Sequence, residues 1–188
     1  MKTLITFFVL LFSSPVFADD ISDFQIEGIS IGDSALDSFS KTDLNNAYDI
    51  FDYKKNKFRY YFLPYEKAKT YDFLQITIKP DDKNFLIYGL QGHIMFRDIN
   101  ECYSKMKEIR INLENVFNIK GIEDSGSHYM DPSGNSTYLR YMFYLSYDDT
   151  AEIVCYDMSN KLEKEGREDR LAITLSKREF IDFINENY

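Results

Sequence analysis

Length, composition and charge limit what this chain can be. Its 188 residues carry 31 acidic and 22 basic side chains, a net charge of −9 at pH 7, which excludes a typical nucleic-acid-binding protein because phosphate contacts need clustered basic groups. The 15 Tyr and 16 Phe residues, without any Trp, favour strands whose rings pack on a pleated sheet.

The N-terminal residues predict an export signal that is removed from the mature protein. Lys2 supplies the positive start, residues 4–12 form a short apolar run, and residues 16–18 (Val-Phe-Ala) suit signal peptidase. The run is too short for a bilayer-spanning helix, which takes roughly 20 apolar residues. We expect cleavage after Ala18 and a periplasmic or extracellular protein of residues 19–188 without a transmembrane segment. An uncleaved anchor or a buried first helix is the alternative.

The first half of the mature chain reads as short helices followed by antiparallel strands. Apolar residues within 24–31 predict a strand that Gly32 ends, and Asp33 is placed to cap a short helix. A capping box at 40–43 starts a second helix. Further strands are expected at 58–63, 71–79 and 85–97, joined by polar turns at 54–57 and 80–84.

The second half repeats this order. Asp98 and Glu101 predict the start of a long amphipathic helix whose apolar residues recur at spacings of three and four. That stripe comprises Cys102, Met106, Ile109, Leu113, Val116 and Phe117. Strands follow near 128 and at 138–147, 151–158 and 170–176, with a charged loop at 161–169 and a helix after Ser176.

These elements predict an α+β fold. Hairpin-length turns join the strands, so the sheet or sheets should be mainly antiparallel, with a central amphipathic helix and a C-terminal helix. We expect one domain over residues 19–188. The repeated element order also allows two similar helix-plus-meander halves, about 19–98 and 99–188, although no residue pattern is repeated.

The cysteines, Cys102 and Cys155, predict a disulfide. An exported protein matures in an oxidising compartment, where an even number of cysteines favours pairing. The bond would join the central helix to the second meander. Two buried free thiols or an intermolecular bridge are the alternatives.

A short block near the mature N-terminus resembles an esterase motif. Residues 28–32 match G-x-S-x-G, and Gly32-Asp33-Ser34 is similar to the nucleophile block of the GDSL (SGNH) esterase family. The resemblance implies Ser34, or alternatively Ser30, as nucleophile with His128 as base. The family's D-x-x-H block is missing, because Asp124 precedes His128 by four residues. Glycines that end a strand, with Asp33 as a helix cap, are the alternative.

Basic and aromatic residues alternate in one region of this acidic chain. Lys54, Lys55, Lys57, Arg59 and Tyr61 are candidates for binding an acidic polymer or an envelope protein. The alternative is a solvated turn beside a strand whose rings face the core.

The sequence predicts no metal site and no cofactor. The histidines, His93 and His128, are too few for a histidine-rich site, and each is expected to be a strand residue with a local hydrogen bond. Asp131, Ser133 and Asn135 have the spacing of a calcium loop, but the required Gly and the distal Glu are misplaced. A plain turn is therefore expected there.

Residues 24–34, the layout of the two cysteines, and the segment containing His128, Asp131 and Gly134 resemble a set of small exported bacterial proteins of unassigned activity. The resemblance implies an exported domain and no particular chemistry. The function expected from the sequence is a non-enzymatic binding or interaction module of the cell envelope. The alternative is a small serine esterase that uses Gly32-Asp33-Ser34.

Overall fold

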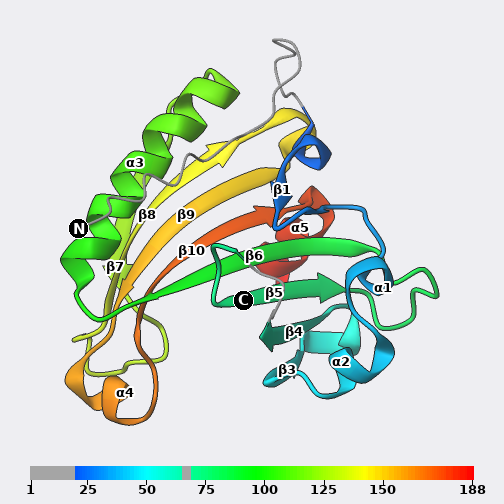
Figure 1. Cartoon of the computed structure of the whole chain (residues 1–188), viewed down its shortest axis with the longest axis horizontal. Coiled ribbons are helices and arrows are strands. Elements are labelled where there is room, and N and C mark those ends of the chain that lie inside the picture. Colours follow the sequence, from blue (N-terminus) through cyan, green and yellow to red (C-terminus); the bar gives the residue numbers. More distant parts are fainter. Residues whose placement is uncertain (1–19, 65–68) are drawn as a thin grey trace, which may run out of the picture.

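One antiparallel sheet of eight strands organises the protein (Figure 1). The computed structural model describes residues 20–64 and 69–188, and the predicted cleavage after Ala18 lies outside them. A separate two-stranded hairpin belongs to the N-terminal segment. The predicted α+β class is confirmed, with mainly antiparallel pairing, a long central helix and a C-terminal helix.

The sheet consists of two meanders joined through their last strands. The first contains β3 (Asp49–Asp52), β4 (Arg59–Pro64), β5 (Phe73–Ile78) and β6 (Ile87–Phe96). The second contains β7 (Ile122–Ser127), β8 (Thr137–Tyr144), β9 (Thr150–Asp157) and β10 (Asp169–Ser176). The strand order is β3-β4-β5-β6-β10-β9-β8-β7, with β6 and β10 paired antiparallel at the centre. A division into two similar halves stays a prediction.

The helices are α1 (Ala35–Ser38), α2 (Lys41–Asn45), α3 (Ile99–Phe117), α4 (Asn160–Lys164) and α5 (Arg178–Asn187). Short 3-10 turns occur at η1 (Ile21–Asp23), η2 (Lys54–Asn56) and η3 (Ser146–Asp148). The capping box expected at 40–43 is confirmed, because the side chains of Ser40 and Asp43 each accept a hydrogen bond from the other's backbone.

Two segments differ from the prediction. The strand expected at 24–31 is a hairpin of β1 (Gln25–Ile26) and β2 (Ile29–Ser30), because Glu27 and Gly28 turn the chain with φ of 55° and 81°. The charged loop expected at 161–169 contains α4, whose Leu162 is buried. The apolar run at 24–31 hid the turn at Glu27 and Gly28 from the sequence pattern, and the charged run at 161–169 hid the helix α4.

The helix α3 and the N-terminal segment cover the same face of the sheet, which we call the covered face. Both lie in front of the sheet in Figure 1. Met106 of α3, Ile76 of β5 and Leu171 of β10 belong to one apolar core. The Sγ atoms of Cys102 and Cys155 are 1.97 Å apart, so a disulfide joins α3 to β9 as the sequence predicts.

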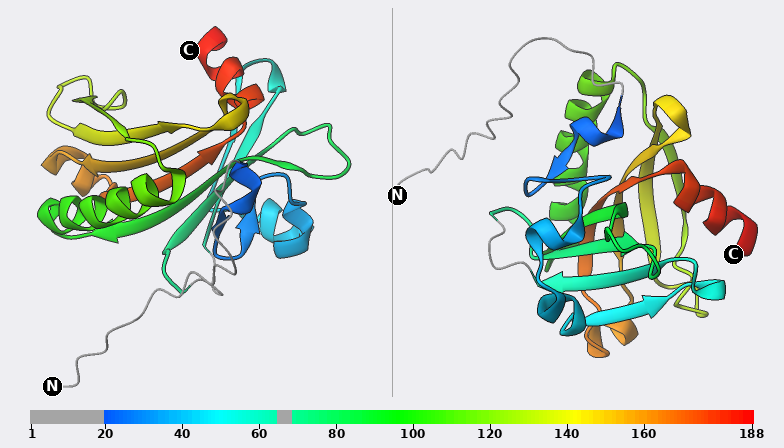
Figure 2. Two further views of the ribbon diagram at one scale, coloured as in Figure 1. Left: turned by 90° about the horizontal axis from the view of Figure 1, so that it is seen from above. Right: turned by 90° about the vertical axis from the view of Figure 1, so that its right-hand side faces the viewer.

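The opposite face of the sheet is covered only at one end. There Phe180 and Phe183 of α5 pack on the fully buried Phe58, with ring centroids 5.1 and 5.2 Å from its ring. Seen from above, α5 stands on the side of the sheet away from α3 (Figure 2, left). The long helix α3 packs on the covered face, and we call the opposite side the open face.

Gly92→Ala is expected to lower the free energy of unfolding by about 1–3 kcal/mol, the usual cost of overpacking a core. A Cβ on Gly92 would lie 2.5 Å from the ring of Tyr71, whose backbone N–H donates to the Glu27 carboxylate. Urea denaturation measures the change. In a Tyr71→Leu background the same substitution should cost less than half as much, and equal costs would show that the ring is not the obstacle.

Candidate functional site: the open face of the sheet

The serines of the esterase-like block have structural partners. Ser34, and not Asp33, caps α1: its Oγ accepts from the N–H of Leu36 at 3.3 Å and donates to the carbonyl of Asn84 at 2.7 Å. Asp33 accepts a hydrogen bond from the N–H of Ser30 at 2.8 Å. The block thus closes a turn and starts a helix, as the alternative interpretation expects, but the cap that it places at Asp33 is wrong.

His128, the base that the esterase hypothesis requires, lies at the other end of the sheet. Ser34 pairs with Leu86, beside the start of β6. The backbone N–H of His128 donates to the carbonyl of Ser136, which comes just before β8. The strand register across β8, β9 and β10 places the start of β8 level with the end of β6. With a rise of about 3.3 Å per residue, β6 separates them by roughly 30 Å. The structure does not bring Ser34 and His128 together.

Tyr61 and Arg59, two members of the predicted basic and aromatic cluster, already have contacts within the protein. Tyr61 faces the covered core with 7% of its surface exposed, so a surface ligand would not reach it. The guanidinium of Arg59 forms a bidentate ion pair with Asp52, with N–O distances of 2.5 and 2.9 Å. We therefore do not assign ligand binding to these two residues.

The three lysines of the cluster lie beside the C-terminal helix. Lys54 donates to the carbonyl of Asn187, and its Nζ is 4.3 Å from the ring centroid of Tyr188. Lys57 lies 4.0 Å from a carboxylate oxygen of Glu179. Lys55 is exposed in η2. Lys54 and Lys57 thus attach the β3–β4 hairpin to α5, and binding by these lysines stays a prediction.

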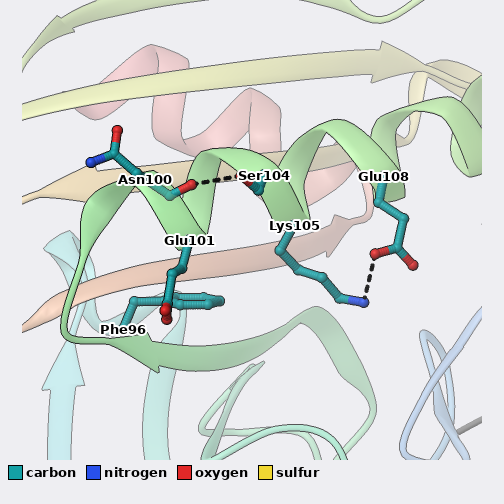
Figure 3. A pocket seen from close by; sticks show the side chains of 6 residues that line it. All are labelled: Phe96, Asn100, Glu101, Ser104, Lys105 and Glu108. Carbon is teal, nitrogen blue, oxygen red and sulfur yellow. Dashed lines mark hydrogen bonds and ion pairs between the residues drawn. The ribbon is translucent and has the colours of Figure 1, made fainter. Parts of the chain in front are cut away.

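A shallow depression of about 470 Å³ lies between α3 and the end of β6. In Figure 3, Glu101 points toward Phe96, and Lys105 is joined to Glu108 with an N–O distance of 3.1 Å. The Oγ of Ser104 donates to a backbone carbonyl one turn earlier. The polar groups of Ser104, Lys105 and Glu108 are thus used in helix and ion-pair contacts, and we do not choose this depression as the candidate site.

The open face gathers aromatic and charged side chains from both meanders. The antiparallel register places alternate residues of β4, β5, β6, β10, β9 and β8 on it. Its partly exposed members include Tyr60, Phe62, Phe73, Gln75, Gln91, Met95, Arg170, Thr174, Glu152, Tyr156, Tyr138, Arg140 and Met142. Such rings and arginines are the side chains that dominate protein interfaces, so this face is the best candidate site.

Arg140 of β8 balances the acidic groups of the open face. Its Nη2 lies 2.7 Å from Asp124 and its Nη1 lies 3.7 Å from Glu152. Its guanidinium is 5.3 Å from the ring centroid of Tyr138. Burial raises the pKa of Glu152, and the charge of Arg140 opposes this shift. These three charged groups therefore form a network that is satisfied within the protein.

His93 lies on the same face with unused hydrogen-bonding groups. Its side chain is only 4% exposed, and its ring packs edge-on against Phe62, with centroids 5.1 Å apart. Neither imidazole nitrogen has a hydrogen-bond partner among the residues that the structure describes. Burial lowers the pKa of His93 to about 3, and the charge of Arg170 adds to the shift. The local hydrogen bond expected for His93 is therefore wrong.

Arg170 of β10 is the charged neighbour of His93. His93 is opposite Ala172 in the register, and Arg170 is two residues further along the same face, a diagonal position about 7–8 Å away between Cα atoms. The guanidinium lies 4.7 Å from the ring centroid of Tyr156. In residues 20–64 and 69–188, Arg170 forms no ion pair. Its charge is thus not balanced as that of Arg140 is.

The loop 128–136 flanks this end of the open face. It stands on the same side of the sheet as α5 in Figure 2 (left, yellow-green). The ring of His128 lies 5.0 Å from that of Tyr129 and 5.2 Å from that of Tyr156, between centroids. His128 has its expected local hydrogen bond, because Nδ1 accepts from the N–H of Met130 at 3.3 Å, but it follows β7 in the loop and is not the strand residue that was expected. The loop therefore extends the aromatic surface beyond the strands.

Asp131 fixes the shape of this loop. Its Oδ1 accepts from the N–H and the Oγ of Ser133 at 3.0 and 2.6 Å, and its Oδ2 accepts from the N–H and the Oγ of Ser136 at 3.0 and 2.7 Å. These hydrogen bonds hold the pKa of Asp131 below its usual range. Both carboxylate oxygens are committed to the turn. Among the described residues, no cluster of His, Cys, Asp and Glu could hold a metal ion.

The sequence pattern could show the alternation of these strands but not which face would stay open. Arg170 fell in a short strand with an apolar alternate face, and its polar neighbours looked like ordinary solvent-facing residues. No local sequence signal could have found this pair, because His93 and Arg170 become neighbours only through the β6–β10 pairing.

Comparison with protein-family models, with curated proteins and with solved structures found no match to this chain. In the part of the chain that the structure describes, every helix is too short or too polar to cross a bilayer.

Proposed function

We propose that this protein is an exported binding module that holds a protein partner on the open face of its sheet. The observation that carries the proposal is the set of rings and arginines on a face that no described helix covers beyond α5. Aromatic and arginine side chains are enriched among the residues that supply most of the binding energy in protein interfaces. Aromatic rings also bury large surfaces at small entropic cost.

A protein partner fits this face better than a polymer does. Arg140 and Glu152 place charges of both signs among the rings, and protein surfaces present both signs in return. A polyanion would meet Glu152 and a chain of net charge −9, so it would be repelled over much of the surface. A neutral glycan would leave the charge of Arg170, which has no ion pair in the described chain, without a partner.

The scaffold supports a preformed site. The strands that carry the rings are central in an eight-stranded sheet, and the disulfide attaches β9 to α3 from behind. A rigid site loses less conformational entropy on binding than a mobile one.

Site-specific photocrosslinking in the native host tests this function. Benzoylphenylalanine at Phe73 or Met142, both partly exposed on the open face, should crosslink the same discrete protein. The matched control is Lys107, which is exposed on α3, the helix on the covered face. Benzoylphenylalanine at this position should not capture that protein. Equal capture from Lys107, or no discrete product from either open-face position, would contradict the proposal.

A further inference from the structure

Arg170 differs from Arg140, the other arginine on the strands of the open face. Arg140 has a carboxylate partner at 2.7 Å, whereas Arg170 has none in the described parts of the chain although it is only partly exposed. A partly desolvated guanidinium without an anion is unfavourable.

The surroundings of Arg170 are arranged to accept an anion. Tyr156 lies against the guanidinium at 4.7 Å, and a ring in this position occupies the flat side of the group while its N–H edges stay free. His93 adds a neutral imidazole whose N–H has no partner in the described chain. Asp131, the acidic residue of the nearby loop, is committed to Ser133 and Ser136 and does not compete.

We propose that Arg170 and His93 form an anion subsite on the open face, and that it takes a side-chain or terminal carboxylate of the protein partner. This inference rests on the proposed function and specifies the chemistry of the partner. Arginine presents a planar fork of N–H donors that matches the two oxygens of a carboxylate. The imidazole, which packs against Phe62 at 5.1 Å between centroids, adds a buried N–H donor that has no partner in the described chain.

An NMR titration of the purified exported protein tests the subsite without the partner. The probes are N-acetyl-glutamate methylamide, its neutral glutamine analogue, and sodium phosphate, at constant ionic strength. The Arg170 Nε–Hε and His93 ring ¹⁵N signals should shift saturably with the glutamate probe. The glutamine analogue should bind at least tenfold more weakly.

Variants identify the groups responsible. Arg170→Gln should weaken the glutamate probe at least tenfold, and Arg170→Lys, which keeps the charge but loses the fork, should weaken it by a smaller factor. Arg178→Gln is the control, because Arg178 is exposed and already paired with Asp148 and Asp182, and it should bind as the wild type does. Unchanged ¹H–¹⁵N spectra outside the face show that each variant is folded.

The outcomes separate the two proposals. Equal shifts with the glutamine analogue, or no saturable shift, would overturn the anion subsite even if crosslinking at Phe73 succeeds. Tighter binding of phosphate than of the glutamate probe would assign the subsite to phosphate groups and overturn the carboxylate claim. Carboxylate binding with no crosslinked protein would support the subsite and count against the proposed function.

Discussion

Lowering the pH from 7.5 to 4.5 is expected to destabilise the wild-type protein by about 2–3 kcal/mol more than it destabilises the His93→Phe variant. Burial, with a contribution from Arg170, lowers the pKa of His93 in the folded protein to about 3, against an ordinary value of 6.5. Between these two values the unfolded chain binds a proton that the folded protein does not. The free energy of unfolding that depends on a neutral His93 is therefore fully present above pH 6.5 and is lost as the pH falls toward 3.

The groups around His93 do not cancel this effect. Arg170 on β10 is a fixed positive charge, and Phe62 on β4 does not titrate. Glu152 on β9 has a raised pKa because it is buried, so its protonation opposes the loss at low pH, but it does so equally in both proteins. The difference between the pH dependences of wild type and His93→Phe therefore reports the protonation of the His93 imidazole alone.

Urea denaturation at pH 7.5, 6.5, 5.5 and 4.5 measures the difference. At pH 7.5, His93→Phe should be at least as stable as the wild type, because an apolar ring replaces a buried polar group whose nitrogens have no partner in the described chain. Parallel stability curves for the two proteins would show that His93 titrates normally. A variant less stable at pH 7.5 by more than about 1 kcal/mol would show that the imidazole makes a stabilising hydrogen bond.

A residue that lowers stability without a structural partner is typical of a functional position. His93 has no hydrogen-bond partner in the described chain, and it lies beside the one partly buried arginine of the described open face that lacks a carboxylate. The proposed subsite gives both residues a role. The acid sensitivity would then follow from the same burial that prepares His93 to donate a hydrogen bond.

Local patterns in the sequence predicted the elements, because their causes are local. The apolar stripe from Cys102 to Phe117 predicted α3, and the alternation in β5 correctly separated buried Leu74 and Ile76 from Gln75 on the other face. The hairpin at Glu27 and Gly28 was missed because Ile26 and Ile29 keep the apolar pattern through the turn. Local rules thus describe regular elements better than the breaks within them.

The candidate site could not be predicted in the same way, because it depends on pairing between distant strands. His93 and Arg170 become neighbours only when β6 and β10, the last strands of the two meanders, pair at the centre of the sheet. Which face stays open depends on where α3 packs after it leaves β6. Tyr61 illustrates the difficulty, since its sequence context suggested a surface ligand site and its strand register places it in the core.

Replacing Cys102 and Cys155 together by Ala is expected to lower the free energy of unfolding by about 4 kcal/mol. The two residues are 53 positions apart, and opening a loop of this length restores much conformational freedom to the unfolded chain. Both side chains are fully buried, so truncation adds a small cavity cost. Either single variant should lose about as much as the double variant, because each removes the whole bond.

Urea denaturation with and without reductant measures the contribution of the bond. Reductant should lower the stability of the wild type to about that of the double variant, and it should leave the double variant unchanged. A wild type that unfolds at the same urea concentration in both conditions would show that the bond contributes nothing. A loss of about 4 kcal/mol is a large part of the 5–15 kcal/mol that stabilises a typical domain. Because β9 carries Cys155 on one face and Tyr156 on the other, the same bond that stabilises the fold also holds the strand on which the proposed subsite is built.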